Sequence, residues 1–263
     1  MKRASNFEIQ SPDSPFRSVL LEIAVASVED ALAAQAAGAA RVELNSAIAL
    51  GGLTPSLGLL AEVKACVTLP VIVMVRPRPG GFAYSDAEFR VLLRDLGVVA
   101  AQGADGIAVG VLTERGEIDT DRMRAVVRAA GAVPVVFHRG FDLVPDPFAA
   151  LEQLIDLGVR RVMTSGQEET AFNGTGRIAE LIRQAERRIE VLPAGGINRF
   201  NVADVIARTE CDQIHCGLRT KCIDSSASGR PHVTFGATIK PAEDHFDSVD
   251  AAAVADMVGR LKG

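Results

Sequence analysis

Acidic, basic and imidazole side chains stand at the ends of short apolar segments in this chain of 263 residues. In chain order the candidates are Glu22, Glu43, Arg76, Arg78, His138, Ser165, Gly195, Gly196 and His215. Enzymes use carboxylates and imidazoles to move protons, whereas guanidiniums, hydroxyls and backbone amides hold anions. If these groups share one site, they favour acid–base chemistry on a small anionic molecule.

Apolar strands alternate with Ala- and Leu-rich helices from Val19 onward. We expect strands near 19–25, 41–45, 71–76, 106–110, 134–139, 161–165, 190–194 and 212–216, and helices near 27–37, 55–66, 86–101, 119–130, 147–157, 175–186, 199–208 and 249–261. Eight strands, each followed by a helix, are typical of a single-domain α/β (β/α)₈ TIM barrel. A doubly wound open sheet is the alternative.

An internal repeat favours the barrel. The segments AAGAARVEL, AQGADGIAV, DLGVRRVMT and, more loosely, TECDQIHCG each end a helix and enter a strand. They precede the second, fourth, sixth and eighth strands only. A barrel built from four quarters would leave this pattern, and it would place all the candidate side chains at one mouth, where the strands end.

The two ends of the chain differ from the barrel pattern. Residues 1–17 are polar and lack periodicity, so we expect a flexible arm before a barrel domain over 18–263. Residues 217–248 also lack clear periodicity, which predicts a long loop after the eighth strand. Loops of that length are functional or disordered, and this one leaves the mouth, so it could form a lid.

Glu43 and His138 are the sharpest candidates for catalysis. In RVELN, Val42 and Leu44 face the helices if Glu43 faces the barrel axis. In PVVFHR, Val135, Phe137 and Arg139 share one side, so His138 takes the other. Glu43 could instead form a structural ion pair with Arg76 or Arg41. His138 could be a general acid or base, a metal ligand or a satisfied core histidine.

Anion binding is the hypothesis for a second group of residues. Arg76 and Arg78 flank a proline, so both guanidiniums could reach one anion, although pairing with carboxylates would also account for them. Gly195 and Gly196 precede a helix, where free amides could hold a phosphate beside Ser165, but tight turns also use glycine.

Composition excludes several functions. The net charge of −5 and the absence of a basic cluster argue against nucleic acid, and no apolar stretch reaches membrane-spanning length. Four cysteines in a chain this long predict reduced thiols and a cytoplasmic protein. His215, Cys216 and Cys222 are weak candidates for a metal site, because their spacing matches no standard zinc pattern and buried unliganded thiols are the alternative.

The sequence resembles the CutC family across nearly all of residues 19–219. The segments that carry the resemblance are LEIAVASVEDALAAQAAGAARVELNSAIALGGLTPS, VMVRPRPGGFAYSDAEF, GADGIAVGVLTERGEID, VVFHRGFD, LGVRRVMTSGQ and AGGIN. The resemblance implies a cytoplasmic barrel, commonly a dimer or tetramer, with a role in copper homeostasis and in some members Cu(I) binding.

The resemblance is incomplete at the soft ligands. Family members carry a cysteine in the first and second strands, where this chain has Ala24 and Asn45. The positions of Glu22, Glu43, Arg76, His138, Ser165 and His215 match those at the family's barrel mouth. Two functions therefore compete: a copper-binding homeostasis protein, and a lyase or isomerase acting on a small anionic or phosphorylated metabolite.

Overall fold

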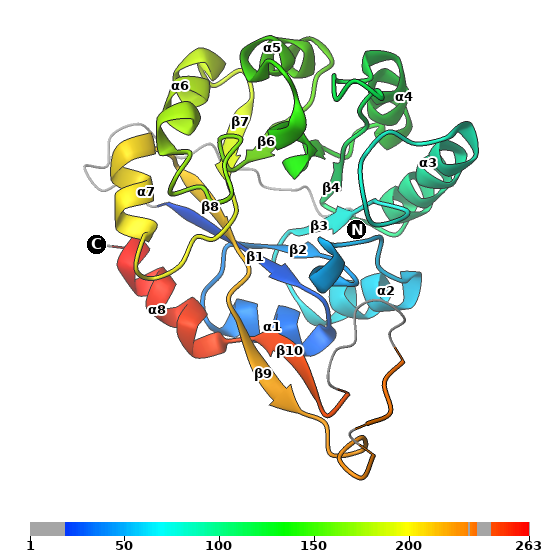
Figure 1. Cartoon of the computed structure of the whole chain (residues 1–263), viewed down its shortest axis with the longest axis vertical. Coiled ribbons are helices and arrows are strands. Elements are labelled where there is room, and N and C mark those ends of the chain that lie inside the picture. Colours follow the sequence, from blue (N-terminus) through cyan, green and yellow to red (C-terminus); the bar gives the residue numbers. More distant parts are fainter. Residues whose placement is uncertain (1–18, 231, 236–242, 263) are drawn as a thin grey trace, which may run out of the picture.

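Eight parallel strands form a barrel in the computed structural model, which describes residues 19–230, 232–235 and 243–262 (Figure 1). The strands are β1 (Leu20–Val25), β2 (Arg41–Leu44), β3 (Val71–Met74), β4 (Gly106–Val109), β5 (Val135–Phe137), β6 (Arg161–Thr164), β7 (Glu190–Pro193) and β8 (Gln213–Cys216). They pair in the order β7-β6-β5-β4-β3-β2-β1-β8, and a parallel bridge between Ala194 and His215 joins the two ends. The predicted TIM barrel is confirmed, and the open sheet is excluded. The expected arm over 1–17 lies outside the described residues.

Eight helices surround the strands in the described part of the chain (Figure 1). They are α1 (Val28–Ala36), α2 (Leu57–Cys66), α3 (Asp86–Ala101), α4 (Thr120–Ala130), α5 (Pro147–Asp156), α6 (Thr175–Ala185), α7 (Val202–Thr209) and α8 (Ala251–Leu261). Side chains cap the first turns of α1–α5 and α8, and Ser85 with Glu88 forms a complete capping box on α3. Each helix is within a few residues of its predicted range. None of the described helices is long and apolar enough to cross a membrane.

The two faces of each strand carry different residues. The outward set packs against the helices in one core that includes Val42, Leu44, Val135, Phe137 and Cys216. The inward set contains two apolar clusters, Ile72, Met74, Ala108 and Val136 in one and Met163, Leu192 and Ala194 in the other. Charged and polar side chains also point into the barrel interior. This alternation places Glu43 and His138 inside, as the sequence pattern predicts.

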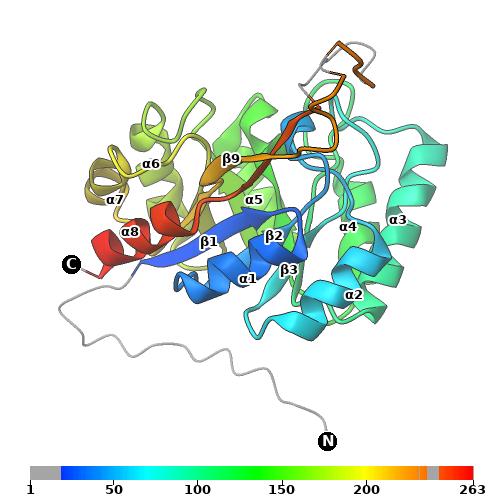
Figure 2. The same cartoon turned by 90° about the horizontal axis from the view of Figure 1, so that it is seen from below.

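A β-hairpin replaces part of the loop expected over 217–248. β9 (Arg219–Ile223) pairs in antiparallel fashion with β10 (His245–Val249). Asp30 of α1 anchors the hairpin, because its buried carboxylate accepts hydrogen bonds from Arg219 (3.0 Å), Ser248 (2.7 Å) and the amide of Val249 (2.7 Å). The hairpin lies beside α1 and projects away from the barrel (Figure 1, Figure 2). The expectation of a structureless loop was therefore wrong for these ten residues.

Candidate functional site

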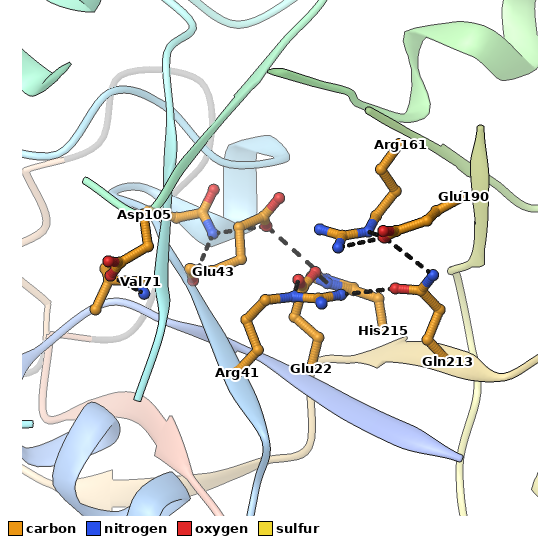
Figure 3. A network of polar contacts seen from close by, with 10 residues as sticks. Glu22, Arg41, Glu43, Val71, Asp105, Arg161, Glu190, Gln213 and His215 are labelled. Carbon is orange, nitrogen blue, oxygen red and sulfur yellow. Dashed lines mark hydrogen bonds and ion pairs between the residues drawn. The ribbon is translucent and has the colours of Figure 1, made fainter. Parts of the chain in front are cut away.

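A network of charged side chains and one amide lies inside the barrel, at the end where the strands begin (Figure 3). Arg41 pairs with Glu22 and also donates to Gln213 at 2.9 Å. On the other side of the barrel Arg161 pairs with Glu190, and Gln213 donates to Glu190 at 3.3 Å. Two guanidiniums thus face two carboxylates, and a shared amide links the pairs. Such pairing is what allows charges to remain buried.

His215 and Glu43 extend this network toward the mouth. The Nδ1 atom of His215 donates to Glu22 at 2.8 Å, and its Nε2 atom lies 3.9 Å from Oε2 of Glu43. Oε2 of Glu43 accepts a hydrogen bond from Asn45 at 2.9 Å. Its other oxygen, Oε1, is buried without a hydrogen-bond partner among the described residues.

The surroundings lower the pKa of Glu22 and raise the pKa values of Glu43 and His215. Burial by itself would raise the pKa of Glu22, but Arg41 and His215 outweigh burial and hold that pKa well below its ordinary value. Burial raises the pKa of Glu43, and the charge of Glu22 adds to the effect against the opposing pull of His215. Burial would lower the pKa of His215, but Glu43 and Glu22 raise it above its ordinary value. Glu22 is thus a fixed anion, and Glu43 holds a proton more readily than an ordinary glutamate.

His138 is a neutral hydrogen-bond donor. Its Nδ1 atom accepts a hydrogen bond from the amide of Gly140 at 3.1 Å, so the ring proton must sit on Nε2. Burial, together with the charge of Arg76, lowers the pKa of His138 to about 3. Nε2 is buried and has no partner among the described residues. In this tautomer Nε2 carries a proton and cannot ligate a metal. Because the ring is also neutral at ordinary pH, the structure favours a role as a hydrogen-bond donor for His138.

Arg76 braces the loops around the mouth. Its Nη1 atom donates to the carbonyls of Leu50 (3.2 Å) and Gly52 (3.1 Å), and its Nη2 atom donates to Gly80 (2.6 Å). The guanidinium also lies 5.0 Å from the ring centre of Phe82. Only Nε lacks a partner. Three of its five N–H groups are therefore committed to loop carbonyls, and the N–H groups left for a ligand are that of Nε and one of Nη2.

These groups meet at one cavity of about 130 Å³. Its lining residues are Glu43, Gly51, Met74, Arg76, Phe82, His138, Arg139, Gly140, Met163 and His215. Four buried side-chain atoms lack a partner in the described chain, and Glu43, Arg76 and His138 supply three of them; the fourth is the hydroxyl of Tyr84, which is not in the lining. No described residue of the β9–β10 hairpin lines the cavity, so the structure does not place the expected lid over it.

Several predicted residues lie outside this cavity. Arg78 pairs with Glu88 of α3 at 2.5 Å and donates to the carbonyls of Gly81 and Ala83 in the loop before that helix. Ser165 donates to Asp142 at 2.9 Å, and Gly195 and Gly196 pack against Arg139 and Thr170. Glu22 does not line the cavity, but it accepts a hydrogen bond from His215, which does.

Arg139 is the cavity residue that the strand pattern misplaced. It was expected on the outward side with Phe137, but β5 ends at Phe137 and a 3-10 turn, Arg139–Leu143, follows. The alternation of a strand therefore does not reach Arg139, and its side chain lines the cavity. The glycine in FHRGFD could have indicated that the strand ends before Arg139.

The cysteines do not converge on this cavity. Cys216 is buried in the outer core, and burial raises the pKa of its thiol to about 12. Cys222 lies on the β9 strand, and all four cysteines are free thiols. Within the described ranges, one group of three or more His, Cys, Asp or Glu residues has ligand atoms close together, within 4.8 Å: Glu22, Glu43 and His215, which contains no sulfur. Cys216 and Cys222 therefore form no metal site with His215.

Comparison with known proteins gives consistent matches. The chain matches the CutC family over residues 19–220, which leaves most of the hairpin outside the match. A CutC family protein of Treponema denticola is 43% identical over 246 residues, which cover 94% of this chain and 99% of that protein. The human copper homeostasis protein cutC homolog is 41% identical over 238 residues, covering 90% of this chain and 87% of the human protein.

Solved structures agree with the fold. A structure of CutC from Streptococcus agalactiae superposes with a TM-score of 0.72 at 31% identity and covers 75% of this chain and 97% of that one. Phosphoribosylanthranilate isomerase from Thermotoga maritima superposes with a TM-score of 0.54 at 13% identity, covering 93% of this chain and 99% of the isomerase, and that likeness concerns the fold alone.

Proposed function

This chain belongs to the CutC family, whose mouse and human relatives are named copper homeostasis proteins, and from that premise we propose that it is an enzyme that transfers protons on a small carbonyl compound. The substrate binds in the cavity at the barrel mouth. Glu43 is the base, and His138 is the donor to the carbonyl oxygen. This role is compatible with the names of the mouse and human relatives, because copper homeostasis is a cellular effect rather than a reaction.

The observation that carries the proposal is the set of unpaired buried atoms. Leaving a buried polar atom without a partner costs about 1–3 kcal/mol, and folded proteins contain few such atoms. Here Oε1 of Glu43, Nε2 of His138 and Nε of Arg76 are unpaired beside one cavity. A bound molecule that accepts from the two nitrogens and gives a proton to the oxygen would satisfy all three.

The reaction step follows from the two protonation states. The Glu43 carboxylate removes a proton from the carbon beside the carbonyl, and the electron pair of that C–H bond moves into the carbonyl group. Negative charge then develops on the carbonyl oxygen, where the Nε2–H group of His138 stabilises it. Enolising isomerases pair a carboxylate base with a neutral imidazole in the same way. The raised pKa of Glu43 strengthens it as a base.

Copper binding is the rival function, and the residues fit it poorly. Cu(I) prefers sulfur ligands, and Ala24 and Asn45 occupy the strand positions where the family's cysteines were expected. In the group Glu22, Glu43 and His215, both Glu22 oxygens and the Nδ1 atom of His215 are already engaged. Oε1 of Glu43 and Nε2 of His215 remain, which is fewer than the three protein ligands of a typical catalytic zinc site. We therefore assign no step to a copper ion.

The assembly and the compartment are also proposals. Ile223 (85% exposed), Phe235 (84%) and Phe246 (55%) present large apolar side chains on the hairpin and next to it. Apolar groups of this size support an interface between copies in a dimer or tetramer. Light scattering on the purified protein tests this, because a monomer would exclude it. Four unpaired thiols support a reducing compartment such as the cytoplasm.

Deuterium exchange tests the proposed reaction without knowledge of the final product. A panel of short oxo acids and hydroxy ketones is incubated with the protein in D₂O, and proton NMR follows the loss of the C–H signal beside each carbonyl. The proposal expects exchange with the wild type and its loss with Glu43→Gln. If the wild type exchanges no member of the panel, or if Glu43→Gln exchanges as fast as the wild type, the proposal is overturned.

A further inference from the structure

Arg139 lines the same cavity, and one end of its guanidinium is free. Its Nε atom donates to Asp142 at 2.9 Å, and its Nη2 atom donates to the hydroxyl of Ser165 at 2.8 Å. These two bonds use the side of the guanidinium that carries Nε. The end formed by Nη1 and the second N–H of Nη2 has no protein partner in the described ranges. Two parallel N–H groups at that end match the two oxygens of a carboxylate.

The surrounding residues hold this edge in place. Asp142 is itself fixed, because it accepts from the hydroxyl of Thr164 at 2.6 Å and from the amides of Ser165 (2.9 Å) and Gln167 (3.2 Å). Gly195 provides room, since a Cβ atom there would lie 3.0 Å from Nη1 of Arg139. A guanidinium oriented in advance by a buried aspartate loses little freedom when it binds a ligand.

We propose that Arg139 binds a carboxylate of the substrate, so that the substrate class is the short oxo acids. The inference rests on the proposed function for one point, the location of the carbonyl at His138. The cavity of about 130 Å³ is well below the roughly 300–1,000 Å³ of sites for drug-sized ligands. A molecule of a few carbon atoms, with one carboxylate and one carbonyl, suits that volume and those two groups.

A carboxylate fits this edge better than a phosphate does. Phosphate carries up to two negative charges, and the cavity already contains the carboxylate of Glu43. The other lining guanidinium, Arg76, already donates three of its five N–H groups to loop carbonyls. A single planar anion therefore matches the free end of Arg139.

Calorimetric titration tests the assignment with three probes: pyruvate, inorganic phosphate and the uncharged ketone dihydroxyacetone. Pyruvate should bind the wild type, and both Arg139→Gln and Arg139→Lys should weaken it by at least about tenfold, because lysine keeps the charge and loses the fork. Arg139→Gln should leave any binding of dihydroxyacetone unchanged. The matched control is Arg124→Gln, since Arg124 is 53% exposed on α4 and pairs with an aspartate three residues away, as does Arg139 (42% exposed).

Each remaining outcome decides the matter. If pyruvate fails to bind, if phosphate binds more tightly than pyruvate, or if Arg139→Gln binds pyruvate like the wild type, the carboxylate assignment is overturned. A melting curve for each variant shows that it is folded. Glu43→Gln separates the two proposals, because it should still bind pyruvate even though it no longer exchanges protons. If the wild type binds pyruvate but exchanges no member of the deuterium panel, the reaction is overturned and the carboxylate site is left standing.

Discussion

The two ends of the barrel interior differ in whether their buried polar atoms have hydrogen-bond partners. At the base, Arg41, Arg161, Glu22, Glu190 and Gln213 bind one another, and none of their buried polar atoms is unpaired. At the mouth, Glu43, Arg76 and His138 each leave one buried atom without a partner in the described chain. Both ends contain arginine and glutamate, and β2 contributes to each, with Arg41 at the base and Glu43 at the mouth.

We infer from this difference that the base stabilises the fold and that the mouth binds the substrate. A network in which every member is paired gives nothing to a ligand, and removing one member leaves its partner charged and buried. Unpaired atoms at the mouth lower stability and can be satisfied by a bound molecule. Substitutions at the base should therefore unfold the protein, whereas substitutions at the mouth should stop its chemistry and leave it folded.

The largest expected effect is at the base. Arg41→Met leaves the Glu22 carboxylate, which is 1% exposed, without its cation, so we expect a loss of about 3–5 kcal/mol in the free energy of unfolding. Urea denaturation measures this loss. The control is Arg160→Met, which removes an exposed partner of Glu190 and should cost less than about 1 kcal/mol. Equal losses in the two variants would contradict the distinction between the base and the surface.

Glu43→Gln tests the mouth. We expect the exchange rate to fall at least about 100-fold, the usual contribution of a general base, while the melting temperature stays the same or rises because a buried carboxylate is removed. The converse variant is Glu190→Gln at the base, which should lower the melting temperature and leave the exchange rate of the folded protein within about twofold. If Glu43→Gln unfolds the protein instead, Glu43 belongs to the structural network.

His138 should make stability depend on pH. Its pKa is about 3 in the folded protein and about 6.5 in the unfolded chain, so the unfolded chain binds the extra proton first as the pH falls. Stability is therefore complete above pH 6.5 and falls by about 1.4 kcal/mol per pH unit below it, or about 2 kcal/mol between pH 6.5 and 5. In His138→Asn the amide oxygen can replace Nδ1, and this part of the slope should vanish. Parallel curves for the two proteins would show that His138 titrates normally.

The smallest effects should come from the thiols. Cys216→Ala removes one sulfur from the outer core and should cost about 1 kcal/mol, and Cys222→Ser on the half-buried β9 position should cost less. Neither change should alter deuterium exchange. Competition with a Cu(I) chelator gives the second measurement, and tight Cu(I) uptake that both substitutions abolish would restore copper binding as the function.

The fold could be predicted because its signals are local. Periodic apolar runs, helix-ending glycines and each single segment of the four-fold repeat lie within about ten residues, and every predicted strand matches an observed one within a few residues. The inward direction of Glu43 and His138 followed from strand alternation alone. The hairpin was missed because Arg219–Ile223 and His245–Val249 are short, far apart in sequence and anchored by Asp30 rather than by their own periodicity.

The site could be predicted only as a set of residue types. Arg76 and Arg78 look alike in RPRPG, yet Arg76 lines the cavity and Arg78 pairs with Glu88. Arg139 changes from outward to inward because a strand ends two residues earlier than its sequence pattern predicts. Which charges are paired depends on contacts such as that of Arg41 with Gln213, which join residues 172 positions apart.

By itself, then, the sequence determined the barrel and which residues its strands point inward, because strand and helix periods are properties of neighbouring residues. The tertiary structure decided which of those residues remain unpaired. Pairing depends on distances across the closed barrel, and it is there that Glu43 keeps a free oxygen, His138 keeps a free N–H group and Glu22 keeps none.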